Sequence, residues 1–124
     1  MAQGGVADVD AAVAVARRAA DDGRWSRVSP GDRKRILQRW ADLIGANARE
    51  LGIIETIDAG KPITDTVGLD MPETAACIRW HAEAIDKLYG QVAPAPEGVV
   101  ATITREPCGV VGAVIPWNYP AQMA

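Results

Sequence analysis

The stretch GVVGAVIPWNYP, Gly109 to Pro120, decides the fold class of this sequence. Val110 to Ile115 form a continuous apolar run, which is typical of a parallel strand covered on both faces. Such strands occur in α/β proteins, and ligands bind beyond the carboxyl ends of the strands. The sequence ends nine residues after Ile115, so we expect the rest of that sheet to lie outside this chain. The polar residues that follow Ile115 are therefore the first candidates for a ligand site.

The residues upstream of this stretch predict helices. Apolar residues recur at helical spacing, with capping or stop residues at the ends, over residues 8–23, 29–44, 47–60 and 63–89. We expect Asp8 to cap the first helix and Ser29 to cap the second, which has a proline at its first position. Gly60 predicts a left-handed end to the third helix. Pro72 lacks a backbone N–H, so the fourth helix either begins near Asp70 or kinks there.

The pattern changes after residue 90. Residues 92–98, VAPAPEG, form a proline-rich connection. Residues 99–106 alternate β-branched and polar side chains, as a half-exposed strand does. The sequence as a whole therefore predicts an α/β chain with four N-terminal helices followed by two strands.

Composition narrows the range of partners. The chain has 124 residues and a formal net charge of −3, with both signs mixed, so we expect neither nucleic acid nor a membrane as a partner. The cluster DRKRILQR, Asp32 to Arg39, contains apolar residues at helical spacing and is interpreted as the solvated face of a helix. Cys77 and Cys108 match no disulfide, CxxC or zinc spacing, and no apolar run is long enough to span a bilayer. Reduced thiols and a cytoplasmic protein are expected.

Few residues offer acid–base or nucleophilic chemistry. His81, the only histidine, and Cys77 lie one turn apart in the fourth predicted helix, where packing or surface roles are favoured. Cys108 lacks an adjacent base, so a structural role is favoured for it too. Asn118 differs, because it lies between prolines after the buried strand, where its NH₂ group can donate to a developing oxyanion. An Asx-turn is the alternative role of Asn118.

Several segments resemble one family. REPCGVVGAVIPWNYP, Arg105 to Pro120, resembles the entry to the coenzyme domain of the NAD(P)-dependent aldehyde dehydrogenase superfamily, whose pattern is close to REPxGVVGxIxPWNxP. ETIDAGKP, Glu55 to Pro62, IRWHAEAIDKLYG, Ile78 to Gly90, and residues 8–44 resemble early helices of the same family, in the same order and spacing. The resemblance covers essentially the whole chain. It is greatest for the aminoaldehyde branch, whose members oxidise γ-glutamylaminobutyraldehyde or betaine aldehyde.

The resemblance implies an oxidoreductase that converts an aldehyde to a carboxylic acid with NAD or NADP, through a cysteine thiohemiacetal. Asn118 is then the side-chain donor that stabilises the tetrahedral oxyanion. Ile115, Pro116 and Trp117, together with Asn118, are expected to line the cofactor cleft. Asp58 matches the position of a monovalent-cation site in the family, although its place in the last turn of the third helix is a sufficient role otherwise.

The resemblance also implies an aldehyde tunnel, lined by Leu69, Glu73, Tyr119, Gln122 and Met123. Glu73 stands where an apolar residue is frequent in the family, and Gln122 stands where a second apolar residue usually follows the PWNxP motif. We hypothesise that a more polar tunnel suits an aldehyde that carries an ammonium or glutamyl group. A solvated Glu73 near a helix start, where its charge favours the helix dipole, is the alternative.

The family's nucleophilic cysteine, water-activating glutamate and ribose-binding lysine belong to segments downstream of Asn118. We therefore interpret the chain as an N-terminal fragment that is inactive alone. Residues 1–90 are its helical part, 91–108 a connection and the outer strand of an oligomerisation sheet, and 109–124 the start of a truncated Rossmann-like domain that binds the coenzyme. A full-length form is expected to be a homodimer or homotetramer. The rival interpretation is a non-catalytic helical remnant or interaction module that binds partners through unpaired strands.

Overall fold

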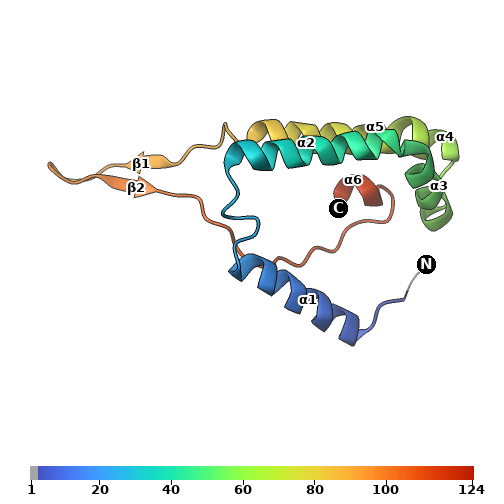
Figure 1. Cartoon of the computed structure of the whole chain (residues 1–124), viewed down its shortest axis with the longest axis horizontal. Helices are drawn as coiled ribbons and strands as arrows, with labels where there is room; N and C mark the ends of the chain where they lie inside the picture. The colour runs from blue at the N-terminus through green and yellow to red at the C-terminus, as the bar shows by residue number, and fades with distance from the viewer. Residues whose placement is uncertain (1–2) are drawn as a thin grey trace.

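The computed structural model describes residues 3–124, and two long helices form its body. α2 (Pro30–Ala46) and α5 (Met71–Ala84) lie side by side and run in opposite directions, with α3 (Ala48–Ala59) at one end of the pair (Figure 1). A small buried core joins them, made by Ala41, Ile44, Met71 and Ala75. Because two of these four side chains are single methyl groups, the helices can approach closely along this seam.

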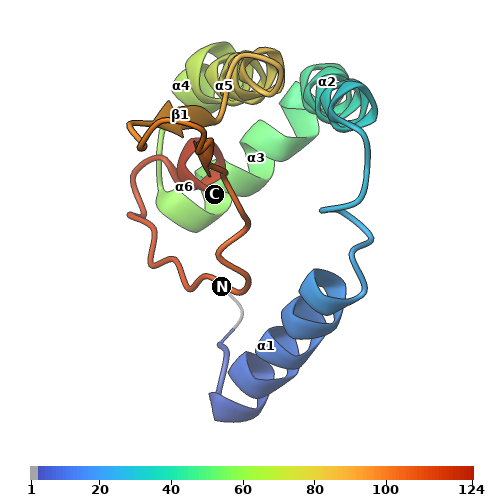
Figure 2. The ribbon, with the colours of Figure 1, turned by 90° about the vertical axis from the view of Figure 1, so that its left-hand side faces the viewer.

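α1 (Val6–Asp21) stands apart from this pair and buries none of its residues (Figure 2). It begins two residues before the expected cap, so the prediction that Asp8 is the N-cap is wrong. Asp8 lies in the first turn, where its carboxylate accepts a hydrogen bond of 2.7 Å from the backbone N–H of Gly5. The side chain still satisfies a free backbone donor at the helix start, but it does so from inside the helix.

The start of α2 and the end of α3 follow the sequence signals closely. The backbone N–H of Asp32 donates to Ser29 Oγ at 3.1 Å, which confirms Ser29 as the cap of α2. α3 ends at Gly60, whose φ of 74° is the predicted left-handed conformation. Asn47 makes no side-chain cap for α3; its NH₂ group donates to the carbonyl of Leu43 at 2.8 Å and satisfies an acceptor at the end of α2.

The fourth predicted helix contains a wider, π-helical turn just before Pro72. α4 (Ile63–Asp65), the π-helical turn η1 (Thr66–Asp70) and α5 follow one another directly. The backbone N–H of Met71 donates to the carbonyl of Thr66, five residues earlier. This wider turn accommodates a proline that has no N–H of its own and crowds the turn before it. The structure therefore has a π-turn where the sequence predicted a helix start or a kink, and the helix ends at Ala84 rather than at Tyr89.

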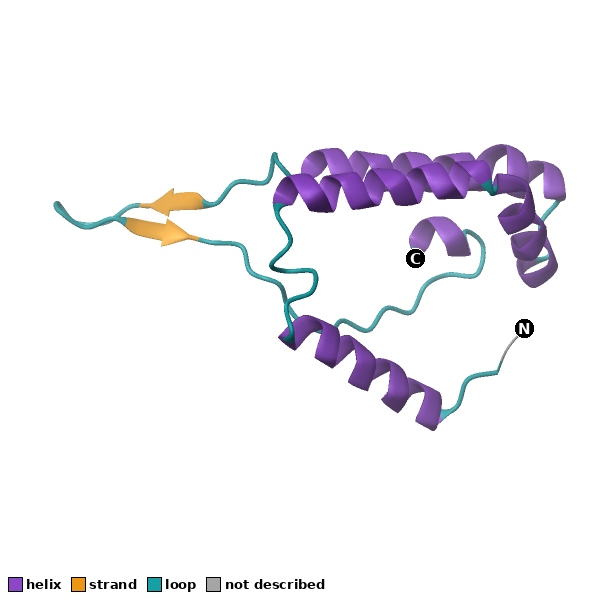
Figure 3. Ribbon diagram, in the orientation of Figure 1, coloured by secondary structure: helices purple, strands orange, loops and turns teal. Residues whose placement is uncertain are grey.

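A β-hairpin extends away from one end of the helical pair (Figure 1, Figure 3). β1 (Gln91–Ala93) pairs antiparallel with β2 (Ala101–Ile103), with Val92 opposite Thr102. β2 confirms that a strand lies within the predicted range 99–106, although it is shorter than that range. β1 lies where only a connection was expected, because a three-residue strand beside prolines has too few residues to show a period of two.

Residues 110–115 form no strand, so that prediction is wrong for this structure. The sheet of residues 3–124 contains only β1 and β2, whereas a parallel strand requires hydrogen-bonding neighbours and covering helices. Val114 is consequently fully exposed. The run ends in α6 (Pro120–Met123), a short helix that packs against α5 and α3. Helices with a two-stranded sheet confirm the α/β class, and among residues 3–124 no helix is long and apolar enough to cross a membrane.

Candidate functional site

Asn118 lies in an exposed turn between residues 110–116 and α6. Trp117 before it is 75% exposed, so most of its side chain is free of packing contacts. Ile115 and Pro116 precede them on the same exposed segment. Within residues 3–124 no hydrogen bond holds the Asn118 side-chain amide, so the Asx-turn that was its alternative role is not formed. The backbone carbonyl of Asn118 accepts a hydrogen bond of 3.1 Å from Lys61 Nζ.

Lys61 connects this turn to the helical body. Its ammonium group forms an ion pair with the carboxylate of Asp70 in η1, whose side chain is 1% exposed. The same Nζ lies 3.9 Å from the centroid of the Tyr119 ring. Lys61 directly follows Gly60, so the left-handed conformation of Gly60 sets the direction in which the chain leaves α3 at Lys61. One ammonium group therefore contacts residues 70, 118 and 119 together.

Glu55 on α3 completes a buried charged cluster behind the turn. Burial raises the pKa of Glu55, and the neighbouring carboxyl group of Asp70 raises it further. Asp70 also raises the pKa of Lys61, mainly through their hydrogen bond. Glu55 Oε1 and Asp70 Oδ1 are buried without a hydrogen-bond partner among the described residues.

Sequence analysis did not single out this cluster of Glu55, Lys61 and Asp70. A local signal existed for Lys61, which stands between a helix-stopping glycine and a proline in GKP. The hydrogen bond from Lys61 to the Asn118 carbonyl joins residues 57 positions apart. No periodic pattern in the sequence predicts such a contact.

A mainly apolar cavity of about 720 Å³ opens between α2, α3, α5 and α6. Of the residues expected to line an aldehyde tunnel, Gln122 and Met123 belong to its wall. Leu69, Glu73 and Tyr119 do not line it. Leu69 and Glu73 lie one turn apart on η1 and α5, and both are exposed. The structure thus brings together only part of the predicted tunnel set.

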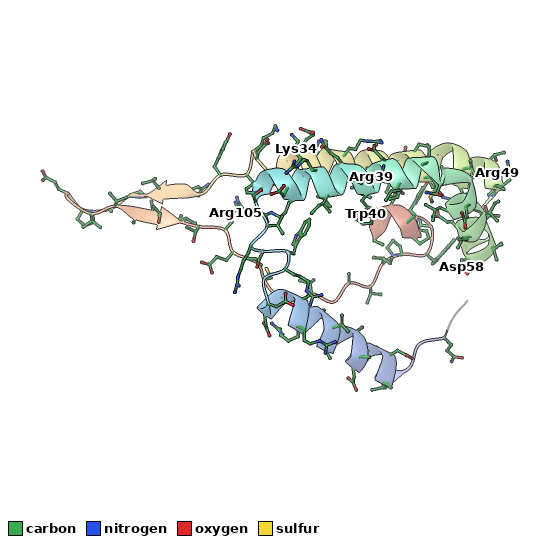
Figure 4. The ribbon with its side chains drawn as sticks, in the orientation of Figure 1. Lys34, Arg39, Trp40, Arg49, Asp58 and Arg105 are labelled. Carbon is green, nitrogen blue, oxygen red and sulfur yellow. The ribbon has the colours of Figure 1, made fainter. Side chains whose placement is uncertain are left out.

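Asp58, the candidate for a cation site, is exposed in the last turn of α3 at the edge of this cavity; Figure 4 labels it, together with Trp40 of the opposite wall. Residues 3–124 hold no group of three or more potential metal-ligating side chains. Any cation at Asp58 would therefore depend on main-chain oxygens or on ligands from elsewhere.

Cys77 and His81 also line the cavity. His81 Nδ1 lies 2.9 Å from the carbonyl oxygen of Cys77 and 3.6 Å from its Sγ. Because a carbonyl only accepts hydrogen bonds, the bond of 2.9 Å places the proton on Nδ1. A protonated Nδ1 is unable to take a proton from the thiol, which agrees with structural roles for both residues.

These observations define an α/β protein in which a helical pair and a partly buried lysine hold a Pro-Trp-Asn turn beside a mainly apolar cavity. The whole chain, residues 1–124, matches the model of the aldehyde dehydrogenase family. The chain belongs to this family, which confirms the resemblance seen in its motifs.

Relatives in this family share about half of the residues. An aminoacetaldehyde dehydrogenase of Pseudomonas aeruginosa is 49% identical over 116 residues, which are 94% of this chain and 23% of that protein. The crystal structure of a γ-glutamyl-γ-aminobutyraldehyde dehydrogenase from Burkholderia cenocepacia is 54% identical, with a TM-score of 0.92 over 99% of this chain and 25% of that one. An indole-3-acetaldehyde dehydrogenase of P. syringae, solved in complex with NAD+ and IAA, is 50% identical, with a TM-score of 0.89 over 94% of this chain and 24% of that one. The chain therefore spans about a quarter of the length of these relatives. Two of the three are named for aminoaldehydes, as the resemblance to the aminoaldehyde branch predicted.

Proposed function

We propose that this chain is the N-terminal part of an enzyme that oxidises an aldehyde to a carboxylic acid with NAD or NADP, and that Asn118 is its oxyanion donor. The observation that supports this most is how the turn presents Asn118. The backbone of Asn118 is held by Lys61, while its side-chain amide is exposed and has no partner among residues 3–124. Because the backbone that carries the amide is already held, fewer conformations remain to be lost when the amide donates to the developing charge.

The chemistry requires a hydrogen-bond donor at the carbonyl oxygen of the substrate. In this proposal a cysteine thiolate outside residues 1–124 attacks the aldehyde carbon, and Asn118 Nδ2 donates to the oxygen as the C=O bond becomes C–O⁻. A bound nicotinamide cofactor would supply the acceptor for the hydride that leaves this carbon. Water then cleaves the C–S bond of the resulting thioester, which gives the carboxylic acid and the free thiol. Removing one oxyanion donor typically costs about 2.7–4 kcal/mol of transition-state stabilisation.

The segment before Asn118 fits one wall of a nicotinamide cofactor site. The indole N–H of Trp117 is a donor only, and Trp117 is 75% exposed, so this N–H suits an anionic pyrophosphate. Ile115 and Pro116 offer apolar surface, and their backbone groups are not part of a strand. In the proposed whole enzyme, residues 109–124 begin the coenzyme-binding domain, 1–90 form the helical part, and 91–108 carry the outer strand of the sheet that joins subunits of a homodimer or homotetramer.

The proposed substrate is an aldehyde that carries an amino or acylamino group. Gln122 supports this choice, because it places an amide in the wall of an otherwise mainly apolar cavity. Glu73 supports it less directly, since its carboxylate is exposed on α5 outside that cavity. The names of the P. aeruginosa and B. cenocepacia relatives point to the same substrate class.

The test joins residues 1–124 in frame to the part of the P. aeruginosa relative that lies beyond the match. We expect this chimera to form NADH from aminoacetaldehyde and NAD+, and the 124-residue chain alone to give no aldehyde-dependent absorbance. Asn118→Ala in the chimera should lower kcat about 10²–10³-fold, because the donor acts mainly in the transition state.

Asn47, the other asparagine of the chain, provides the matched control, since it lies at the junction of α2 and α3. Asn47→Ala should leave kcat within a factor of about two of the unmodified chimera. Unchanged kcat in a folded Asn118→Ala chimera would contradict the role of Asn118. Sustained turnover by the 124-residue chain would contradict the view that the nucleophile lies outside it.

A further inference from the structure

We propose that Lys61 is a positioning residue for the Asn118 turn, and that it acts with Asp70 and Glu55 as one buried charged cluster. Its effect on catalysis rests on the proposed function above. Its effect on the conformation of residues 117–124 does not, because it follows from contacts within this chain.

The contacts of Lys61 are concentrated on the turn. Its Nζ donates to the Asn118 carbonyl at 3.1 Å and lies 3.9 Å from the centroid of the Tyr119 ring. Among the described residues, Lys61 is the one side chain of the helical body that donates a hydrogen bond to residues 110–124, while the Glu55 carboxyl accepts one from the backbone of Ala121. The conformation of the turn therefore depends on the Lys61 donor together with the packing of α6 on α5 and α3.

The ammonium group of Lys61 is itself held by an ion pair with Asp70. Asp70 pairs with Lys61 and is 1% exposed, while the Lys61 side chain is 17% exposed. Asp70 belongs to the π-turn η1, which is tied to α3 by a hydrogen bond of 2.8 Å between the hydroxyl groups of Thr56 and Thr66. Glu55, the residue before Thr56, is 6% exposed and shares the environment of Asp70. The ammonium group is thus held by η1, which is hydrogen-bonded to α3.

The energetics favour a positioning role over a stabilising one. Removing charges from water costs free energy that a buried ion pair often fails to recover, so burial alone gives no reason for this cluster. A charge-assisted hydrogen bond is short and directional, and it gives the acceptor a defined place. The acceptor here is the carbonyl of Asn118, which lies in the same residue as the proposed catalytic amide.

The first experiment measures amide hydrogen exchange in the 124-residue chain. Lys61→Met keeps a long side chain and removes the charge. The amides of Met123 and Ala124, which donate within α6 at 3.1 Å, and the amide of Ala121 beside Glu55 should exchange about tenfold faster than in the unmodified chain. Helical circular dichroism should stay close to that of the unmodified chain, and exchange in α2 and α5 measures any loss of global stability, against which the faster exchange of residues 119–124 is compared.

Lys34→Met is the matched control. Lys34 also pairs with acidic groups, Glu83 and Asp86, but it lies on α2 and makes no hydrogen bond to residues 110–124 in the described structure. Its substitution should leave exchange in residues 119–124 unchanged. Equal exchange in the Lys61→Met and Lys34→Met chains would overturn the proposal.

Two further variants separate positioning from loss of folding. Lys61→Met leaves Asp70 buried and unpaired, which is strongly destabilising; the double variant Lys61→Met/Asp70→Asn removes that charge as well. It should recover global stability while residues 119–124 still exchange fast. Lys61→Arg keeps a donor for Asp70 and Asn118 and should keep more protection than Lys61→Met. Recovery of slow exchange in the double variant would show that the ammonium group does not hold the turn.

The chimera supplies the catalytic measurement. Lys61→Met should lower kcat more than it raises KM, and its effect should largely vanish in an Asn118→Ala background, because both changes act on the same donor. Full additivity of the two effects would overturn the positioning role. An inactive unmodified chimera would contradict the proposed function and leave the exchange result to decide the role of Lys61 in the turn.

Discussion

At the scale of single residues, Glu55 is a buried carboxyl group whose pKa is raised by folding. Burial, followed by the neighbouring carboxyl group of Asp70, raises this pKa above its ordinary value of 4.5, while Lys61 and the backbone of Ala121 act in the opposite direction. The folded chain therefore holds a proton that the unfolded chain releases above about pH 4.5. The free energy of unfolding should fall as the pH rises from this value through the raised pKa of the folded chain.

Glu55→Gln tests this pH dependence. Glutamine has nearly the same shape, is neutral at every pH, and can donate to Asp70 through its NH₂ group. Urea unfolding at about pH 5 and about pH 8 should show that the substitution becomes more favourable, relative to the unmodified chain, at the higher pH. A difference between the two chains that does not vary with pH would mean that Glu55 titrates in the folded chain as it does in the unfolded one.

Glu73 is the residue that tests the proposed substrate. In the chimera, Glu73→Leu should raise KM for amino-substituted aldehydes more than for aliphatic aldehydes of similar length, if the rest of the enzyme completes an aldehyde tunnel that includes Glu73. Asp65→Leu is a matched control, since Asp65 ends α4 and lies outside the predicted tunnel set. Equal changes in KM for both aldehyde classes would leave Glu73 with the solvated role at a helix start.

At the scale of the elements, α3 and η1 approach each other closely at Gly52. A Cβ atom on Gly52 of α3 would lie 2.6 Å from Val67 Cγ2 and 3.1 Å from the Val67 backbone nitrogen. Only glycine therefore allows α3 to approach the π-turn that carries Asp70. The wide turn at residues 66–70 and the small residue on α3 are two parts of one packing arrangement.

Gly52→Ala should lower the free energy of unfolding by about 1–3 kcal/mol, as overpacking does, although alanine is the better helix former. Gly45→Ala in α2 is the matched control, because a Cβ there meets nothing within 4 Å. It should raise stability by about 0.5 kcal/mol through helix propensity alone. Thermal or urea unfolding of the two variants should thus give changes of opposite sign; a stabilising Gly52→Ala would contradict the tight contact.

The sequence predicted elements well where local chemistry decides them. Ser29 with Pro30 marked the start of α2, and Gly60 marked the end of α3, since caps and left-handed ends depend on neighbouring residues only. Pro72 showed where the fourth helix is irregular, but whether the irregularity is a helix start, a kink or a π-turn depends on packing against α3. The strand predicted at residues 110–115 depends on neighbours that are not among residues 3–124, so its apolar pattern alone did not produce it.

At the scale of the whole molecule, the described chain divides into a packed body and parts that are barely attached to it. α2, α3, η1 and α5 share the buried core and its surroundings, whereas α1 buries none of its residues. Val6 and Val9 of α1 are 79% and 61% exposed, although they belong to the apolar side of an amphipathic helix. Helices of this length are marginal in water when no packing supports them.

Hydrogen exchange along the 124-residue chain should reflect this division. Amides of α1 should exchange near the rate of an unfolded peptide, while amides of α2 and α5 near Ala41 and Ala75 should be protected up to the global stability. In the chimera α1 should become protected as well, if other parts of the enzyme cover its apolar side. Strong protection of α1 in the 124-residue chain would contradict its weak attachment.

The sequence by itself determined the family, the α/β class, the four helical regions and the position of the Pro-Trp-Asn turn, because these depend on motifs, periodicity and caps that are local in the chain. Only the tertiary structure decided that Lys61 holds Asn118, that Asp70 and Glu55 lie behind it, and that Gln122 faces the cavity while Glu73 does not. The physical reason is distance along the chain: a hydrogen bond between residues 57 positions apart exists only after α3, η1 and α6 have packed.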